Sequence, residues 1–265
     1  MTVVHADLRD EIFARIADRA FAAAVIAAEA GIVAAVDSAA EAAEEVGLTI
    51  EARRSEASCV RPGDEILRLH GTPKQIALGE ERIVGMLAKP SGIATAARRF
   101  VDRAAGRPRI VSGAWKKLPF SQKDMIRSAI LAAGAEPRIA TPPFVYLDKN
   151  CVRMLGGVEA TLAAVAHLED HRKVIQLDDP TAACAAARAG ADIVFVDIGR
   201  LEDAAIASRR LRDAGLRERV ELAFGGGVEL DDIDQLTHTD VDAVDIGRAI
   251  VDAPLLDMRI EVRSP

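Results

Sequence analysis

Aromatic residues, cysteines and excess basic charge are all scarce in this 265-residue chain. Phe, Trp and Tyr make up 3% of it while half of its residues are hydrophobic, so a sizeable core must be built mainly from aliphatic side chains. The three cysteines, Cys59, Cys151 and Cys184, form no CxxC pair and no zinc-ligand spacing, which argues against a disulfide framework or a structural zinc site. The formal net charge of −7 argues against a nucleic-acid-binding surface.

The sequence also shows no pattern typical of a targeting or membrane-spanning segment. The first seven residues contain no basic stretch, and the most apolar region, residues 21–36, is interrupted by Glu29. We therefore expect a cytoplasmic protein that acts on small molecules, with neither nucleic acid nor a membrane as its partner.

Three apolar runs between Asp192 and Ala249 each end in residues that are unusual for a core. The runs are Ile193–Val196, Val220–Phe224 and Ala243–Ile246. Short apolar runs separated by helical patterns indicate buried parallel strands, whose carboxyl ends carry the ligand sites of α/β barrels. Glycines at such ends allow backbone N–H groups to approach an anion. The sequence predicts a phosphate site at Gly225, Gly226, Gly227, Gly247 and Arg248; the alternative is that these glycines only form turns and helix caps.

Further strand and helix patterns alternate through the second part of the chain. The other strands are expected at Arg109–Ser112, Phe144–Leu147 and Lys173–Leu177. The helices are expected at Ser121–Ala133, Val158–His167, Pro180–Ala189, Leu201–Ala214 and Asp231–Thr237. Six strands are fewer than the eight of a complete barrel, so we expect an incomplete, six- to seven-stranded α/β barrel over residues 89–251.

The N-terminal part has a different pattern, which predicts a small α+β module. Helical spacing covers residues 7–30, and strands are expected at Ile32–Val36, Leu48–Ala52 and Ile66–His70. Ser38 is expected to cap a helix over Ala39–Val46, and two longer helices, Pro73–Ala88 and Ser91–Ala105, are expected on either side of a break at Lys89-Pro90. Residues 255–262 alternate like a strand, so we assign residues 1–88 and 252–265 to one module.

Several short motifs resemble those of the quinolinate phosphoribosyltransferases, the carboxylating nicotinate-nucleotide pyrophosphorylases. The resemblance covers nearly the whole chain and is most specific at Glu81-Arg82 and Ser91-Gly92-Ile93-Ala94-Thr95. Other matching positions are the Pro-Gly-Asp turn at 62–64, Lys116 with Leu118-Pro119, Asn150, residues 191–197, Gly226-Gly227 and Val241-Asp242 with Gly247. The resemblance implies an N-terminal module joined to an α/β barrel. It also implies a homodimer, or a dimer-based hexamer, in which subunits share active sites.

The family joins a pyridine dicarboxylate to phosphoribosyl pyrophosphate with magnesium and then releases carbon dioxide. The resemblance implies catalytic roles for Lys116, Asp178 and Asp197, with the two aspartates as tentative Mg²⁺ ligands. It implies acceptor or pyrophosphate contacts for residues scattered along the chain, namely Arg82, Trp115, Arg138, Asp148, Asn150 and Gln176. Arg82 would act across the dimer interface.

The chain departs from the family pattern where the acceptor's carboxylates would bind. An arginine, a histidine and a lysine of the family are replaced by Trp115, Pro137 and Asp148, and other changes stand at Gln176, Ala223 and Gly225. Opposite charges in contact are worth on the order of a few kcal/mol, so these losses should abolish tight binding of a dianion. Lys117 and Lys149 lie one residue along and could compensate only if they follow the strand ends, because adjacent strand side chains face opposite ways.

We therefore expect a phosphoribosyltransferase whose acceptor is a heteroaromatic ring other than quinolinate. Trp115 would offer a stacking face, or alternatively would only pack between the domains, and Asp148 with Lys149 would bind ligand or form a surface ion pair. Two other classes stay open. One is a barrel that binds a sugar phosphate and performs lyase or condensation chemistry at Lys116, and the other is a noncatalytic relative that binds a nucleotide-like ligand or a partner subunit.

Overall fold

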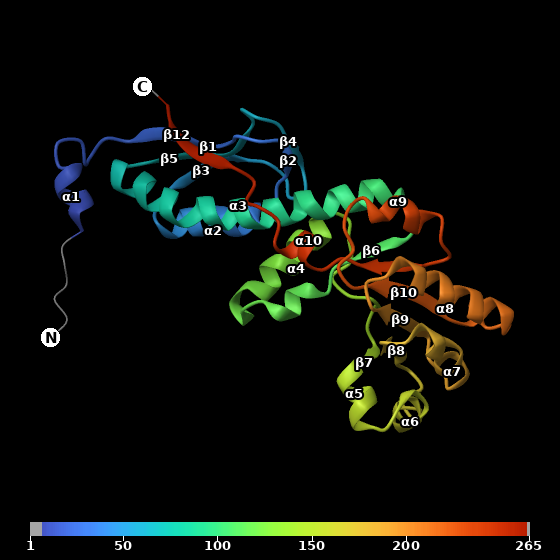
Figure 1. Ribbon diagram of the computed structural model, residues 1–265. Helices are drawn as coiled ribbons and strands as arrows, with labels where there is room; N and C mark the ends of the chain where they lie inside the picture. Colours follow the sequence, from blue (N-terminus) through green and yellow to red (C-terminus); the bar gives the residue numbers. More distant parts are fainter. Residues whose placement is uncertain (1–6, 264–265) are drawn as a thin grey trace. The chain divides into compact units, whose positions relative to one another are not determined.

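The computed structural model describes residues 7–263, which form two compact units (Figure 1). The first unit comprises residues up to Thr95, Asp124–Ala133 and the segment from Pro254 onward, and the second comprises Ala96–Lys123 and Gly134–Ala253. No helix within residues 7–263 is both long and apolar enough to cross a membrane.

The first unit is built on a four-stranded antiparallel sheet in the order β12-β1-β5-β3. Its strands are β1 (Phe21–Ala27), β3 (Thr49–Arg53), β5 (Glu65–Gly71) and β12 (Met258–Val262). A two-stranded sheet pairs β2 (Gly31–Ile32) with β4 (Cys59–Val60), and the helices of this unit are α1 (Leu8–Ile12), α2 (Val36–Glu45), α4 (Lys123–Ala132) and the first part of α3 (Pro73–Ala104). The pairing of β12 with β1 confirms that the C-terminal strand completes the N-terminal module.

The expected helix over residues 7–30 is wrong beyond its first turns. Its alanine-rich second half is β1, a central strand that pairs with β5 on one side and β12 on the other. Alanine has the highest intrinsic helix propensity, but that preference is small for each residue. The burial of β1 between two partner strands outweighs it here. The strand expected at Ile32–Val36 is also wrong after Ile32, because the Glu56 carboxylate accepts the N–H groups of Ala35 and Val36 and α2 begins there, before Ser38.

The expected helix break at Lys89-Pro90 does not occur, since α3 continues through Pro90. Proline removes one amide donor, and the N–H of Leu256 donates to the nearby carbonyl of Ala88 at 3.0 Å. Gly92 allows this close packing, because a Cβ there would lie 1.9 Å from the Pro254 carbonyl oxygen. Ser91 and Thr95 accept the N–H groups of Ala34 and Ile32, so this motif helps to hold the first unit together.

The second unit contains a six-stranded parallel sheet in the order β6-β11-β10-β9-β8-β7. Its strands are β6 (Arg109–Val111), β7 (Phe144–Leu147), β8 (Arg172–Leu177), β9 (Ile193–Asp197), β10 (Glu221–Gly225) and β11 (Ala243–Asp245). All six agree with the expected strands to within one residue at each end. Among the described residues no strand pairing joins the edge strands β6 and β7, so the sheet has the six parallel strands of an incomplete barrel and is not closed by hydrogen bonds.

Short helices follow these strands in the manner of βα units. The helices are α5 (Lys149–Met154), α6 (Val158–Ala164), α7 (Ala183–Arg188), α8 (Leu201–Asp213), α9 (Asp232–Thr237) and α10 (Arg248–Val251). Single 3₁₀ turns are η1 (Ala114–Lys117), η2 (Phe120–Gln122), η3 (Pro180–Ala182) and η4 (Arg217–Arg219). The core of the sheet includes the fully or almost fully buried side chains of Val174, Ile193, Phe195 and Ala223.

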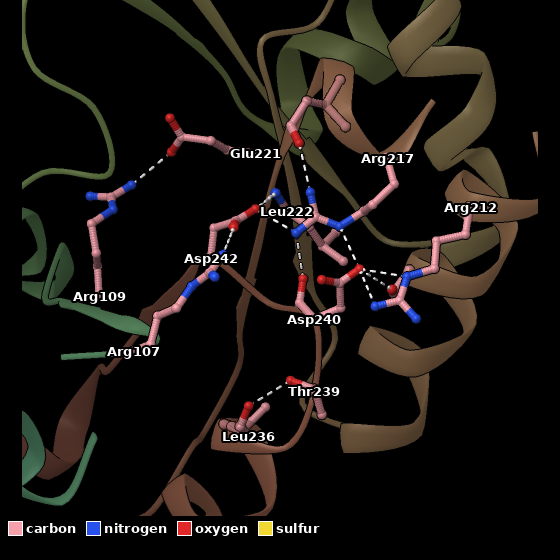
Figure 2. A network of polar contacts seen from close by, with 12 residues as sticks. Arg107, Arg109, Arg212, Arg217, Glu221, Leu222, Leu236, Thr239, Asp240 and Asp242 are labelled. Atoms are coloured by element: carbon pink, nitrogen blue, oxygen red, sulfur yellow. Dashed lines mark hydrogen bonds and ion pairs between the residues drawn. The ribbon is translucent and has the colours of Figure 1, made fainter. Parts of the chain in front are cut away.

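A polar network ties together the amino ends of β10 and β11 (Figure 2). Arg217, whose side chain is 9% exposed, donates to Asp240 at 2.9 Å, to Asp242 at 2.6 Å and to the Val220 carbonyl at 2.9 Å. Arg212 also pairs with Asp240. Contacts at the amino ends of barrel strands serve stability, which leaves the opposite edge of the sheet for ligands.

Replacing Arg217 with methionine is expected to lower the free energy of unfolding by about 3–5 kcal/mol, since two partly buried carboxylates lose their shared cation. Urea unfolding followed by circular dichroism measures the change. Arg219→Met on the same turn is the control and should change stability by less than about 0.5 kcal/mol, because Arg219 is exposed. Equal effects of the two variants would contradict this role of Arg217.

The network should also make stability depend on pH. Burial alone would raise the pKa of Asp240, but the Ser208 hydroxyl and the charges of Arg217 and Arg212 outweigh it and hold that pKa below its ordinary value. The unfolded chain then binds more protons, so the contribution of Asp240 is present above the unfolded pKa and is lost as the pH falls below about 4. The stability difference between wild type and Arg217→Met should therefore shrink in acid, and a difference that is independent of pH would argue against it.

Candidate functional site

A cavity of about 500 Å³ opens at the carboxyl ends of the parallel strands in the second unit. Residues that follow β6, β10 and β11, together with residues on β7, β8, β9 and β11, contribute to its wall. Seven of the predicted site residues line it: Lys116, Gln176, Asp197, Gly226, Gly227, Gly247 and Arg248. The topology therefore brings together side chains that lie more than a hundred residues apart in the sequence, at the edge where parallel sheets bind ligands.

The glycines give this cavity a wall of exposed backbone. Gly226 has a φ of +106°, and a Cβ there would lie 2.6 Å from the Gly199 backbone nitrogen. Gly225 is buried behind it, accepts the N–H of Gly199 at 3.1 Å and could not carry a Cβ without meeting the Phe195 ring at 2.9 Å. Gly227 and Gly247 face open space. Gly226, Gly227 and Gly247 can thus present peptide groups to an anion, while Gly225 is required for packing.

Asp197 ends β9 and is the central acidic residue of this cavity. The Gln176 side-chain amide donates to its carboxylate, and the Lys149 ammonium lies 3.7 Å from it and donates to the Asp197 carbonyl oxygen at 2.6 Å. Asp197 and Lys149 are 28% and 27% exposed. Three elements therefore fix the orientation of one carboxylate, which remains accessible to a ligand.

Lys117 and Lys149 could compensate for the lost positive charge only if they followed the strand ends, and both do follow them. Lys117 belongs to η1, after β6, and lines the cavity, whereas Lys149 begins α5 directly after β7 and reaches Asp197. Because neither lies on a strand, the strict alternation of side chains does not apply to them. The expected loss of positive charge is therefore partly offset in the larger cavity.

A smaller cavity of about 220 Å³ adjoins the larger one and is mostly apolar. Trp115 and Arg138 line it, with the Arg138 guanidinium 5.3 Å from the indole centre and the indole N–H donating to the Pro137 carbonyl at 2.6 Å. The Lys116 ammonium lies 4.9 Å from the centre of the Tyr146 ring. Cation–π contacts thus hold both cations against aromatic faces.

Asp245 is a site residue that the sequence pattern did not reveal. It lies inside the run Ala243–Ile246, where it ends β11, and its carboxylate lines both cavities. Burial raises its pKa, against the opposing effects of the Gly113 N–H and Lys116. Burial also raises the pKa of Tyr146, with Asp245 and Asp197 adding to the effect. A carboxylate within an apolar run was the available signal for Asp245.

Besides Gly225, four predicted site residues lie outside both cavities. Asp178 is exposed and pairs with Arg153 at 3.3 Å, and Asn150 contacts the same arginine. Asp148 caps α5 by accepting the N–H of Cys151, which is the main cause of its lowered pKa, so its observed contact is structural. Arg82 belongs to the first unit, where its exposed side chain lies 3.9 Å from Glu45.

The residues present fit a magnesium ion that arrives with a phosphorylated ligand better than a permanent metal site. No group of three or more His, Cys, Asp or Glu side chains suitable for a metal occurs within residues 7–263. Magnesium commonly binds to one or two carboxylates together with substrate phosphates, which Asp197 at the cavity wall can satisfy.

Comparisons with known proteins agree with this architecture. The quinolinate phosphoribosyl transferase N-terminal domain matches residues 7–91, and the C-terminal domain of the same family matches residues 93–261. A probable nicotinate-nucleotide pyrophosphorylase (carboxylating) of Methanothermobacter thermautotrophicus is 28% identical, over 91% of this chain and 88% of that protein. A second, from Archaeoglobus fulgidus, is 29% identical over 77% and 79% of the two chains.

The fold is shared with solved structures as well. The nicotinate-nucleotide pyrophosphorylase of Francisella tularensis superposes with a TM-score of 0.85 at 21% identity, covering 99% of this chain and 92% of the other. Two family domains that together span almost all described residues confirm the resemblance inferred from the motifs. The chain belongs to the quinolinate phosphoribosyltransferase family.

Proposed function

We propose that this chain is a cytoplasmic phosphoribosyltransferase of the nicotinate-nucleotide pyrophosphorylase type, which uses phosphoribosyl pyrophosphate and a heteroaromatic acceptor other than quinolinate. The observation that carries the proposal is the pair of adjoining cavities at the carboxyl edge of the sheet. One is polar and lined by backbone, by three cations and by four carboxylates, and the other is mostly apolar and aromatic. A phosphorylated sugar suits the first and a flat ring suits the second.

In the larger cavity, each group of the donor substrate finds a partner of suitable chemistry. Peptide groups at Gly226, Gly227 and Gly247 suit the 5′-phosphate, with the guanidinium of Arg248 beside them. Lys116 and Lys117 suit the pyrophosphate that leaves. Asp197 suits the ribose hydroxyls and the positive charge that develops at the anomeric carbon as the bond to pyrophosphate breaks.

The junction between the cavities is where the new bond would form. Lys116, Tyr146 and Asp245 line both cavities, so an acceptor nitrogen held in the smaller cavity can approach the anomeric carbon held in the larger one. Magnesium, when bound with the pyrophosphate, would neutralise the charge of the leaving group, with Asp197 and, as a prediction, Asp178 as its protein ligands. We also propose a homodimer, or a dimer-based hexamer, in which Arg82 serves the partner's site.

Calorimetry should show that phosphoribosyl pyrophosphate binds to the full chain and that Mg²⁺ strengthens the binding. Asp197→Asn should weaken binding by about ten- to a hundredfold, which corresponds to the loss of a charge-assisted contact. Asp213→Asn is the matched control, because Asp213 is exposed at the end of α8 and lines neither cavity. The control should change the affinity less than threefold, roughly the scatter of such measurements.

Two results would count against the proposal. Lack of binding at millimolar ligand would favour a barrel with lyase or condensation chemistry at Lys116, or a noncatalytic relative. If Asp178→Asn lowered the affinity for phosphoribosyl pyrophosphate more than Asp197→Asn did, the donor substrate would stand, but Asp178 would replace Asp197 as the main carboxylate of the site.

Lys149→Met should lower the affinity for phosphoribosyl pyrophosphate by about tenfold, because Asp197 loses the cation that bonds its backbone oxygen and lies beside its carboxylate. Lys149→Arg retains the charge and is expected to recover most of the affinity. The same calorimetric titration measures both variants. If the Lys149→Met and Lys149→Arg variants bound phosphoribosyl pyrophosphate with equal affinity, Lys149 would have only a packing role.

A further inference from the structure

Asp245 and Asp197 face the same cavity from two strands that are separated by a glycine. In the register of the parallel sheet, Gly225 on β10 is the partner of Asp197 on β9 and of Asp245 on β11. Partners in register on neighbouring strands point to the same face, and glycine places no side chain between them. Both carboxylates line the larger cavity, but only Asp245 also reaches the smaller one.

The hydrogen-bonding capacity of the Asp245 carboxylate is only partly used by the protein, although the charges of Lys116 and Lys117 act on it. Its Oδ1 accepts the N–H of Gly113 at 2.7 Å, which is its one hydrogen bond to the described residues. The rest of the group faces the cavities. A half-buried carboxylate that is only partly bonded disfavours a second negative charge nearby, and it favours a ligand that donates a hydrogen bond.

The charges around the smaller cavity do not suit a dianion. Its cations are Lys116 and Arg138, and each lies over an aromatic ring. Lys117 lines only the larger cavity, and Lys149 lines neither but contacts Asp197 at the wall of the larger one, so neither adds charge to the smaller cavity. An acceptor with two carboxylates would therefore meet two cations that already lie over aromatic rings, together with the carboxylate of Asp245.

We propose that Asp245 is the specificity-determining residue of the smaller cavity, and that it selects a flat heteroaromatic acceptor with at most one negative charge and an N–H or O–H donor directed at Asp245. The inference rests on the proposed function, in which this cavity holds the acceptor. It names the class of acceptor from the charges and hydrogen-bonding capacity of the wall. Asp245 thereby gains the partner that the protein itself does not supply.

Three pyridine probes of similar shape test this selection by direct calorimetric binding to the full chain without the co-substrate. Quinolinate is a dianion, nicotinate a monoanion, and nicotinamide a neutral ring with an amide donor. Quinolinate should bind to the wild type at least about tenfold more weakly than the better of the other two. Asp245→Asn removes the charge at nearly constant shape and should raise the quinolinate affinity by about tenfold.

Asp213→Asn is again the control and should leave the ranking of the probes unchanged, because Asp213 lines neither cavity. Stronger binding of quinolinate than of both other probes to the wild type would overturn the proposal, and this measurement needs no variant. An unchanged ranking in a folded Asp245→Asn protein, or no binding of any probe at millimolar concentration, would overturn it as well. A separate titration with phosphoribosyl pyrophosphate reports on the larger cavity, so its failure would contradict the proposed function while leaving the ranking of the rings to be read independently.

Discussion

The register of three parallel strands is the constraint on which the site depends. It places Asp197, Gly225 and Asp245 in one row across β9, β10 and β11, at the point where the sheet ends and the cavities begin. The row works only with glycine at its centre, because a Cβ there would lie 2.9 Å from the Phe195 ring and 3.3 Å from the Asp245 carbonyl. A shift of one residue in any strand would turn its carboxylate to the opposite face, so the buried apolar runs that set the register also set the chemistry.

The two edges of the same sheet carry charge in different ways. At the amino edge, Arg217 lies between Asp240 and Asp242, and each carboxylate there has a nearby guanidinium. At the carboxyl edge, Asp245 accepts one hydrogen bond among the described residues, from the Gly113 N–H, and the Lys116 ammonium whose charge acts on it lies over the Tyr146 ring. Charges that are satisfied internally stabilise the fold, whereas charges held with incomplete partners are available for a ligand. The contrast therefore identifies the functional edge independently of any motif.

Buried parallel strands were the most predictable part of this molecule, because a short apolar run between helical patterns has few alternatives. Local patterns were less informative where tertiary contacts decide the structure. The alanine-rich β1 reads as a helix until its two partner strands are known, and α3 passes through Pro90 because residues far along the chain pack against it. The glycines and Asp197 could be found at strand ends, whereas Asp245 could not, since its position relative to β11 depends on where that strand stops.

The position of Lys149 shows why a comparison of aligned letters can misjudge a site. A shift of one residue within a strand reverses a side chain, but after the end of a strand the backbone turns, and the first residue of the next helix can still face the cavity. Asp148 takes the capping position of α5, and this leaves Lys149 at the start of the helix, within reach of Asp197. The exchange of a lysine for an aspartate and of an aspartate for a lysine thus keeps a cation beside the Asp197 carboxylate. Two other departures, Trp115 and Pro137, stand where the family pattern has an arginine and a histidine, and both line the smaller cavity, so the proposed acceptor would meet the altered part of the site.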